Sequence, residues 1–441
     1  MPADKPIGRR SEIESWGRIS RVPHTVQAPA FLADARSALA ECSRSTLALG
    51  AARSYGDVCL NRDGELIRMT ALDRMIAADW STGIIRAEAG LSLDALLRIA
   101  VPRGFFLPVT PGTKFVTLGG SIANDVHGKN HEHAGTFGCH VRRLGLARSS
   151  GEVLELSPRD NAELFVATIG GLGLTGLILW VELALKPISS TAIEVETLAI
   201  TDLDHFFRLA GESGDWEHTV AWIDCLARGK DLGRGLFMRG RHQAGGALKP
   251  HGEARLSVPI DAPSWLLNAT TVRLFNLGYR HRPWAMGRRI WHYDPFFYPL
   301  DSLLGWNRLY GRRGFFQHQS VVPTGSAVGA MQRLLTLTGD YRQGSFLIVL
   351  KLFGRVRSPG LLSFPTEGAT LAVDLPNRGD STRKLLQAMT DAALDAGGRI
   401  YPAKDATMSA EAFRLGYPRW TKLEVLRDPR IMSDLWRRLT Q

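Results

Sequence analysis

The chain is poor in cysteine, and it has no long hydrophobic run that is free of glycine. Four cysteines occur among 441 residues, and no two of them form a Cys-x-x-Cys pair. This number and spacing indicate neither a disulfide scaffold nor a zinc module, and they fit a reducing compartment. The longest uncharged run, residues 164–181, is just long enough to cross a membrane. The four glycines in its centre favour a turn between two buried segments instead.

The N-terminal residues lack the apolar segment of a signal peptide. We therefore expect no signal peptide, no transmembrane helix, and a location that is cytoplasmic or peripheral at a membrane face. Glycine and positive charge are abundant, with 45 clustered glycines and a net charge of +11. The Lys and Arg residues are spread along the chain, without the basic block of a nucleic-acid-binding arm. This balance favours an anionic small molecule or lipid as the partner, and no nucleic acid.

Residues 45–187 alternate predicted strands and helices, which is typical of an α/β or α+β domain. Glycine-rich turns separate the predicted strands STLALG, GIIRAEAG, GEVLELS and LTGLILWVELAL. Helical patterns lie between them. Gly104 is a candidate end for one of these helices, and Asn161 is a candidate N-cap for the next.

The second half of the chain has a different texture. Predicted strands FFQHQSVVP, GSFLIVLKLFG and ATLAVDLP alternate with predicted helices SAVGAMQRLLTLTG and STRKLLQAMTDAALDAGG. Residues 240–295 are irregular, basic and rich in His, Trp and Pro, so we expect a mobile loop that orders on a ligand or a membrane surface. From Arg399 onward, the sequence predicts a short strand and a closing helix.

Three glycine-rich segments carry the candidate chemistry. Gly50 to Asn61, GAARSYGDVCLN, follows a predicted strand, and its backbone N–H groups could bind a pyrophosphate. Arg53 could add charge and Asp57 could brace the turn, although a tight turn without a ligand explains the pattern about as well. The run IGGLGLTGLI, residues 169–178, resembles G-x-G-x-x-G, but it follows a helix and leads into a strand. That order argues against a Rossmann fingerprint.

The segment 109–141 combines glycines, hydroxyl side chains and four histidines. Its loops can hold phosphates and ring edges with backbone donors. His127, His131, His133 and His140 invite a metal interpretation, but they lack helical H-x-x-x-H spacing and a carboxylate pattern. We predict no metal. The alternative is that these are loop histidines that hydrogen-bond to the backbone. This interpretation fits His131 and His133 better than it fits His127.

The sequence is similar to the FAD-linked oxidases of the vanillyl-alcohol-oxidase (PCMH) type in three motifs that occur in order: ARSYGD, TPGTKFVTLGGSIANDVHGKNHEHAGTFG and FVATIGGLGLTGLI. More narrowly, HGKN, WNRLYGRRGFFQHQ, VLKLFG and YPAKD resemble the family of decaprenylphosphoryl-β-D-ribose 2-oxidases. The likeness runs from about residue 15 to the end of the chain.

The resemblance implies an α+β fold, with a two-part FAD-binding domain and an inserted antiparallel-sheet substrate domain with helices. Residues 1–190 would form the FAD-binding domain, 191–398 the substrate domain, and 399–441 a return to the FAD-binding domain. The implied cofactor contacts are Arg53, Ser54, Tyr55, Gly56, Gly112, Thr113, Gly119, Gly120, Ser121, Asn124, His127, Gly128, Thr136, Gly173 and Ile178. The implied substrate contacts are Lys129, Trp222, Gln317, Gln319, Lys351, Phe353, Thr370 and Ala372.

The resemblance also implies the catalytic residues Lys404, Lys351, Tyr55 and His127. Oxidation of a secondary alcohol leaves negative charge on the flavin, and an ammonium such as that of Lys404 would stabilise it. A Lys or Tyr side chain near the reacting oxygen could take its proton. Lys351 lies in the apolar run IVLKLFG, where burial would lower its pKa, although strand alternation also permits a solvent-facing side chain.

Three positions depart from the family pattern. Thr370 and Ala372 stand where the family has Asn and Cys, and Phe297 stands where it has Tyr, with Tyr298 next to it. One wall of the pocket is therefore altered, which puts the sugar or lipid in doubt. Many flavoproteins of this superfamily carry in the first glycine-rich turn a histidine that bonds to the flavin. The sequence Arg53-Ser54-Tyr55 replaces it here, so we expect noncovalent FAD.

The favoured function is FAD-dependent oxidation of the 2-hydroxyl of a polyprenylphosphoryl-β-D-ribose, the first half of an epimerisation that a short-chain reductase would complete. The alternatives are a soluble aldonolactone or sugar-alcohol oxidase, and a non-catalytic flavin-binding or membrane-adaptor protein. The retained Lys351 and Lys404 argue against a mere binder. We also expect peripheral membrane binding. Its predicted contacts are Arg239, Arg241, Lys249, Arg280, Arg282, Arg288, Arg289, Trp265, Trp284 and Trp291.

Overall fold

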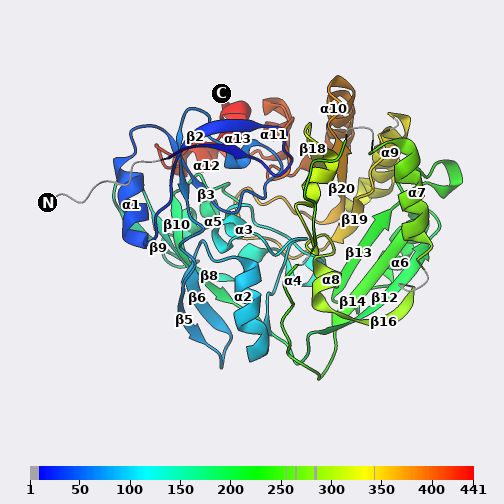
Figure 1. Cartoon of the computed structure of the whole chain (residues 1–441), viewed down its shortest axis with the longest axis horizontal. Coiled ribbons are helices and arrows are strands. Elements are labelled where there is room, and N and C mark those ends of the chain that lie inside the picture. Colours follow the sequence, from blue (N-terminus) through cyan, green and yellow to red (C-terminus); the bar gives the residue numbers. More distant parts are fainter. Residues whose placement is uncertain (1–8, 255, 264–265, 283–285, 342) are drawn as a thin grey trace.

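The computed structural model describes residues 9–254, 256–263, 266–282, 286–341 and 343–441 (Figure 1). It combines helices with three main sheets, which confirms the predicted α+β class. In Figure 1 the first two sheets lie at the left, and the third and largest lies at the right.

The first sheet has the strand order β1-β2-β4-β3. Its strands are β1 (Arg9–Glu14), β2 (Arg21–Gln27), β3 (Thr46–Leu49) and β4 (Glu65–Arg68), with helix α1 at Leu32–Glu41. The inner pairs β2/β4 and β4/β3 are parallel, and β1/β2 is antiparallel. Strand β3 confirms the strand predicted from STLALG, and it leads directly into the first glycine-rich turn.

The second sheet is antiparallel, with the order β5-β6-β10-β8-β9. Its strands are β5 (Met75–Asp79), β6 (Ile84–Glu88), β8 (Val141–Ala147), β9 (Val153–Leu156) and β10 (Leu177–Ala184). The accompanying helices are α2 (Leu93–Ala100), α3 (Leu118–Ala123), α4 (His131–Ala134) and α5 (Ala162–Thr168). The uncharged run 164–181 divides into the end of α5, a glycine turn and the start of β10, as predicted.

The structure confirms one boundary of each of two predicted helices. A short 3-10 turn extends α2 to Arg103, and Gly104 ends it with a left-handed φ of +81°, as predicted. Asn161 is the N-cap residue of α5, as predicted, but its side chain makes no capping bond. Its amide donates instead to the carbonyl of Glu155 at 2.9 Å.

The third sheet has eight strands in the order β16-β12-β14-β13-β19-β20-β18-β21, and all neighbours are antiparallel. The strands are β12 (Ala192–Ile200), β13 (His218–Ile223), β14 (Gly235–His242), β16 (Gly287–His292), β18 (Phe315–Pro323), β19 (Ile348–Phe353), β20 (Gly368–Pro376) and β21 (Arg399–Ile400). Helices α6 (Leu203–Gly211), α9 (Ala327–Asp340) and α10 (Asp380–Asp395) pack against it.

Residues 240–295 contain more regular structure than the sequence indicates. They hold the end of β14, the short strand β15 (Leu256–Ser257), the helix α7 (Ala269–Arg280), the strand β16 and the start of α8 (Tyr293–Phe297). The prediction of an irregular loop is therefore wrong for α7 and β16. The physical reason is local for α7, because the Asn268 side chain accepts from the amides of Thr270 and Thr271 and so caps the helix. For β16 it is tertiary, because pairing with β12 supplies the hydrogen bonds.

The C-terminal segment returns to the first sheet through α11 (Ala410–Gly416), α12 (Trp420–Leu426) and α13 (Asp434–Thr440). Thr46 of β3 pairs with Ile431 in an isolated parallel bridge. Two further two-stranded pairs join β7 (Phe105–Phe106) to β11 (Lys186–Pro187) and β15 to β17 (Leu303–Leu304). The predicted division at residues 190 and 398 stays a prediction, which this return of the chain favours.

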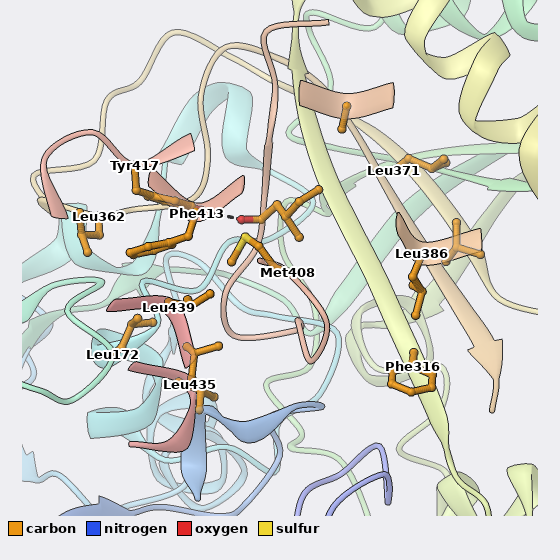
Figure 2. Close-up of a cluster of buried hydrophobic side chains, with 14 of the residues drawn as sticks. Leu172, Phe316, Leu362, Leu371, Leu386, Met408, Phe413, Tyr417, Leu435 and Leu439 are labelled. Carbon is orange, nitrogen blue, oxygen red and sulfur yellow. Dashed lines mark hydrogen bonds between the residues drawn. The ribbon is translucent and has the colours of Figure 1, made fainter. Parts of the chain in front are cut away.

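The C-terminal helices contribute to a core that also includes the eight-stranded sheet. Figure 2 shows part of it, where Phe413, Tyr417 and Leu435 lie near Leu172 and Met408. The same cluster continues to β18, β20 and α10 through the buried Phe316, Leu371 and Leu386. Burial of this apolar surface holds the tail, which carries the motif YPAKD, against the rest of the molecule.

Candidate active site

A cavity of about 390 Å³ lies where the glycine-rich segments of residues 50–55 and 110–129 face the eight-stranded sheet. Nineteen of the sequence-predicted residues line it: Arg53, Ser54, Tyr55, Gly112, Thr113, Gly119, Gly120, Asn124, His127, Gly128, Lys129, Gly173, Ile178, Trp222, Gln317, Gln319, Lys351, Ala372 and Lys404. Segments that are up to about 350 residues apart in the chain therefore meet at one site.

One half of the cavity has a wall of backbone and small side chains. A Cβ atom added at Gly112 or Gly173 would meet no atom within 4 Å, so both glycines border open space. Two lining residues carry buried polar atoms, because the Nε atom of Arg53 and the Oδ1 atom of Asn124 have no hydrogen-bond partner among the described residues. Asp301 also lines the cavity, and it accepts from the backbone amide of Lys114 at 2.8 Å. Open glycines and unpaired polar atoms fit a long polar ligand such as a dinucleotide.

The cavity also holds three lysines. The Lys404 ammonium lies 4.0 Å from the centroid of the Tyr55 ring, and that of Lys351 donates to the carbonyl of Gly128 at 3.4 Å. The Lys129 ammonium donates to the carbonyl of Phe296. Because three cations share one site, negative charge that develops there is stabilised.

Burial shifts the titration of all three lysines. Burial and the nearby Lys404 lower the pKa of Lys351 to about 8. Burial and the nearby Lys351 lower the pKa of Lys129 to about 7. Burial also lowers the pKa of Lys404 to about 8, with the carboxylate of Asp374 acting in the opposite direction. These side chains can therefore gain or lose a proton near neutral pH.

Gln317 and Gln319 lie on one face of β18, as their spacing predicts. The Gln319 amide donates to Nε2 of His127 at 2.9 Å and to the hydroxyl of Thr370 at 3.3 Å. The Gln317 amide donates to the carboxylate of Asp374. The two glutamines are thus held in place, with their side chains at the cavity wall.

His127 is neutral in this site. Burial, and then the charge of Lys351, hold its pKa well below the ordinary value. Its ring centroid lies 4.9 Å from that of Phe353 and 5.3 Å from that of Tyr401. The Nδ1 atom has no partner among the described residues, whereas Nε2 accepts from Gln319. The proton of the neutral ring is therefore assigned to the buried Nδ1.

Five predicted contacts lie behind the cavity wall: Gly56, Ser121, Thr136, Phe353 and Thr370. The Ser121 hydroxyl donates to the carbonyl of Thr117 at 2.9 Å within its own helix. Thr136 pairs with His127 in an isolated bridge, and Phe353 packs on the same imidazole. These residues support the wall, and their direct contact with a ligand stays a prediction.

Asp374 is the main site residue that the sequence analysis missed. It is fully buried on β20, and burial raises its pKa to about 7 against the effects of the Gln317 amide and the Lys404 charge. Its Oδ2 atom has no partner among the described residues. The available signal was a single acid within the apolar strand LAVDLP, a position that burial alone disfavours.

The turn that carries Tyr55 and the loop that carries Lys404 are joined by one arginine. Arg438 of α13 donates to both carboxylate oxygens of Asp57 at 2.9 Å, and to Asp405 at 3.0 Å. The backbones touch at the same place, because a Cβ atom at Gly56 would lie 1.6 Å from the carbonyl oxygen of Asp405. Asp57 does brace the turn, as proposed from the sequence, through a partner in the last helix.

Two of the three departures from the family pattern line the cavity, and the third, Thr370, lies behind its wall. Ala372 and Phe297 line it, and the Thr370 hydroxyl accepts from Gln319. The hydroxyl of Tyr298 does not replace the missing tyrosine, because it bonds to the hydroxyl of Thr110 at 2.6 Å. The altered wall is therefore smaller and less polar than the family pattern implies.

The glycine-rich segment places its other histidines away from one another. His133 bonds to the carbonyl of Trp216 at 3.1 Å, and His140 bonds to that of Ala134 at 2.9 Å. His131 packs against Phe353. Among the described residues, no group of three or more His, Cys, Asp or Glu side chains is arranged to hold a metal ion.

The fold and the cavity define a class of flavoenzyme, and the comparisons with known proteins agree. Residues 23–157 match a family described as an FAD binding domain. The matched range includes the glycine-rich segments 50–61 and 109–141 and thus Gly112 of the cavity wall, whereas Gly173 lies beyond it. The chain is an FAD-dependent oxidoreductase of the PCMH type, with FAD as its cofactor.

The relatives specify the family. A decaprenylphosphoryl-β-D-ribose oxidase of Mycolicibacterium smegmatis is 35% identical and covers 96% of both chains. An uncharacterised protein of Streptomyces coelicolor is 32% identical over 79% of this chain and its own full length. The mouse L-gulonolactone oxidase is 29% identical over 40% of each chain. This chain belongs to the decaprenylphosphoryl-β-D-ribose oxidase family.

Proposed function

We propose that the protein oxidises the 2-hydroxyl of a polyprenylphosphoryl-β-D-ribose to the 2-keto form, the first half of an epimerisation to the arabinose form. The relative that covers almost the whole chain is named for the decaprenylphosphoryl sugar. The observation that carries the proposal is the convergence of Lys129, Lys351 and Lys404 with Gln317 and Gln319 on the same cavity as the glycine-rich segments. A short-chain reductase would complete the epimerisation by returning hydrogen to the same carbon.

In this reaction FAD supplies the acceptor for two electrons and for the hydrogen that leaves the oxidised carbon. Lys351 in its neutral form takes the proton of the hydroxyl, which a pKa of about 8 permits near neutral pH. The amide groups of Gln317 and Gln319 orient the sugar hydroxyls. Lys404 keeps a positive charge beside Tyr55, where it stabilises the negative charge that the reaction produces.

The remaining cavity lining suits the lipid part of the substrate. Apolar surface comes from Trp222 of the eight-stranded sheet, Tyr279 of α7, Leu303 and Leu304 of β17, and Trp306. The Trp222 ring lies 4.8 Å from that of Tyr279, and its N–H is already bonded to the carbonyl of Phe346. A free sugar alcohol would leave this apolar surface uncovered, which favours a lipid-linked sugar over the soluble alternative.

The proposal is tested with the purified flavoprotein under anaerobic conditions. Polyprenylphosphoryl ribose is expected to bleach the flavin absorbance, whereas free sugar alcohols and aldonolactones leave it unchanged. Bleaching by a free sugar alcohol or an aldonolactone, without bleaching by the lipid-linked ribose, would refute the proposal. A Lys351→Gln variant should retain FAD and lose bleaching. Retained FAD would show that the loss comes from the missing lysine and not from general damage to the protein.

A polyprenyl substrate places the enzyme at a membrane. Within the part of the chain that the structure describes, no helix is both long and apolar enough to cross a bilayer. We therefore propose peripheral association.

A further inference from the structure

Helix α7 exposes an apolar face that no described residue covers. Val272 and Asn276 point inward and are buried, whereas the side chains of Leu274 and Leu277 are 64% and 58% exposed. Phe275 is 45% exposed at the edge of this face, where its ring meets Phe346. Three large apolar side chains in four consecutive positions form a patch of the kind that marks an interaction surface.

This patch is continuous with the wall of the active-site cavity. Tyr279 belongs to the same helix, stacks on Phe275 at 5.6 Å and lines the cavity. The β15/β17 pair also borders the cavity through Leu303 and Leu304. Further exposed apolar side chains of this region are Leu256, Ile260 and Leu304. The apolar lining of the cavity therefore extends outward over both elements.

Positive charge predominates on and beside helix α7. Helix α7 contains Arg273 and Arg280 and no acidic residue. Arg282 follows it, with its guanidinium 3.8 Å from the centroid of the Tyr279 ring. Near β15, Glu253 is exposed, whereas Asp261 is held by Arg18 and Arg308 at 2.7 and 3.0 Å. An apolar face flanked by arginines fits the surface of an anionic bilayer.

The structure also corrects the predicted membrane contacts. Arg239 and Arg288 pair with Glu196, and Arg241 pairs with Glu194, so these cations are neutralised on the sheet. Trp291 packs against a buried core cluster. Trp265 and Trp284 lie outside the described residues.

We propose that the surface formed by Leu256, Ile260, Leu274, Phe275, Leu277 and Leu304, called here the α7 surface, rests on an anionic lipid bilayer. In that position the cavity opens toward the lipid between Tyr279 and Leu304. The polyprenyl chain of the substrate then passes from the bilayer to the active site along apolar side chains, which avoids its exposure to water. Only this last step depends on the proposed function, and docking on the bilayer does not.

The test uses the FAD-loaded protein and vesicles without substrate. Co-sedimentation is measured with phosphatidylcholine alone and with added phosphatidylglycerol. Wild type should bind the anionic vesicles and dissociate as salt rises, because exposed charges are screened. The variant Leu274→Ser/Leu277→Ser should bind these vesicles at least roughly 10-fold more weakly than wild type, because two apolar anchors are lost. Arg273→Glu/Arg280→Glu should abolish the preference for anionic vesicles.

A matched control comes from the C-terminal helices. Leu415 and Val425 are 65% and 84% exposed on α11 and α12, which lie near the top centre of Figure 1, apart from α7 at the right. The variant Leu415→Ser/Val425→Ser should therefore bind vesicles like wild type. Equal vesicle binding by both double serine variants would overturn the proposal.

A second copy of the chain is the other occupant that the test distinguishes. If the α7 surface were a dimer contact, the Leu274→Ser/Leu277→Ser variant would change from dimer to monomer in gel filtration while wild type failed to bind vesicles. That outcome would also overturn the proposal. Failure of the proposed function is seen separately, because flavin bleaching by substrate in detergent does not require the bilayer.

Discussion

Replacing Lys404 with methionine tests the catalytic assignment most directly. The side chain lies in the cavity with its ammonium 4.0 Å from the centroid of the Tyr55 ring. Methionine keeps much of the bulk and removes the charge. The neighbouring Asp405 carboxylate is occupied by Arg438 and by the amides of Thr407 and Met408, so it does not take the Lys404 charge.

The magnitude follows from the position of the charge. Burial lowers the pKa of Lys404 to about 8, and the nearby Asp374 carboxylate acts in the opposite direction and favours the charged ammonium. One charge that is already in place where negative charge develops contributes ~2–4 kcal/mol to the transition state. We therefore expect Lys404→Met to slow anaerobic flavin reduction roughly 10²–10³-fold while FAD stays bound.

The assay is stopped-flow flavin reduction with saturating polyprenylphosphoryl ribose. Deuterium at the oxidised carbon should slow the same step in wild type, which shows that bond cleavage is being observed. Lys422→Met, at an exposed position on α12, is the matched control and should reduce at the wild-type rate. Wild-type kinetics in Lys404→Met, with full FAD content, would refute the assignment.

Three further outcomes are expected. The reduction rate should first rise with pH, as Lys351 loses its proton near pH 8 and becomes able to accept the substrate proton. It should fall at higher pH, as Lys404 loses its charge, which also titrates near pH 8. A rate independent of pH from 6 to 10 would contradict both roles. Arg438→Met should lower the free energy of unfolding by about 2–3 kcal/mol, because two partly buried carboxylates lose their cation, and Arg438→Lys should recover only part of it. Unchanged melting temperature in the methionine variant would argue against the bridge. Acid precipitation should release the flavin into the supernatant, since the first glycine-rich turn offers no histidine for a covalent bond; a yellow pellet would show the contrary.

Much of the candidate site could be predicted because it consists of local motifs. A glycine-rich turn after a strand has the same backbone character wherever it is placed, so the segments 50–61 and 109–141 indicated a phosphate-binding wall before any contact was known. The period-two pattern of FFQHQSVVP likewise placed Gln317 and Gln319 on one strand face. For residues 164–181, the four glycines likewise favoured a turn over a membrane span, and the structure contains that turn.

The functions of single charged residues were decided only by the tertiary structure. Nothing local indicates that Arg438, three residues from the C-terminus, joins the Tyr55 turn to the Lys404 loop, because an ion pair between distant segments leaves no periodic pattern. Burial raises the pKa of Asp374 even though the charge of the nearby Lys404 acts in the opposite direction. That burial depends on how β20 lies in the sheet.

The α7 surface shows the same division between what the sequence indicated and what the tertiary structure decided. Composition alone identified residues 240–295 as basic and aromatic, and it directed attention to arginines that the folded chain pairs with Glu194 and Glu196. The exposed leucines of α7 are ordinary helix residues in sequence. They become an unpaired apolar face only because Val272 and Asn276 turn inward against the rest of the domain, and which side of a helix stays in solvent is set by its neighbours in space.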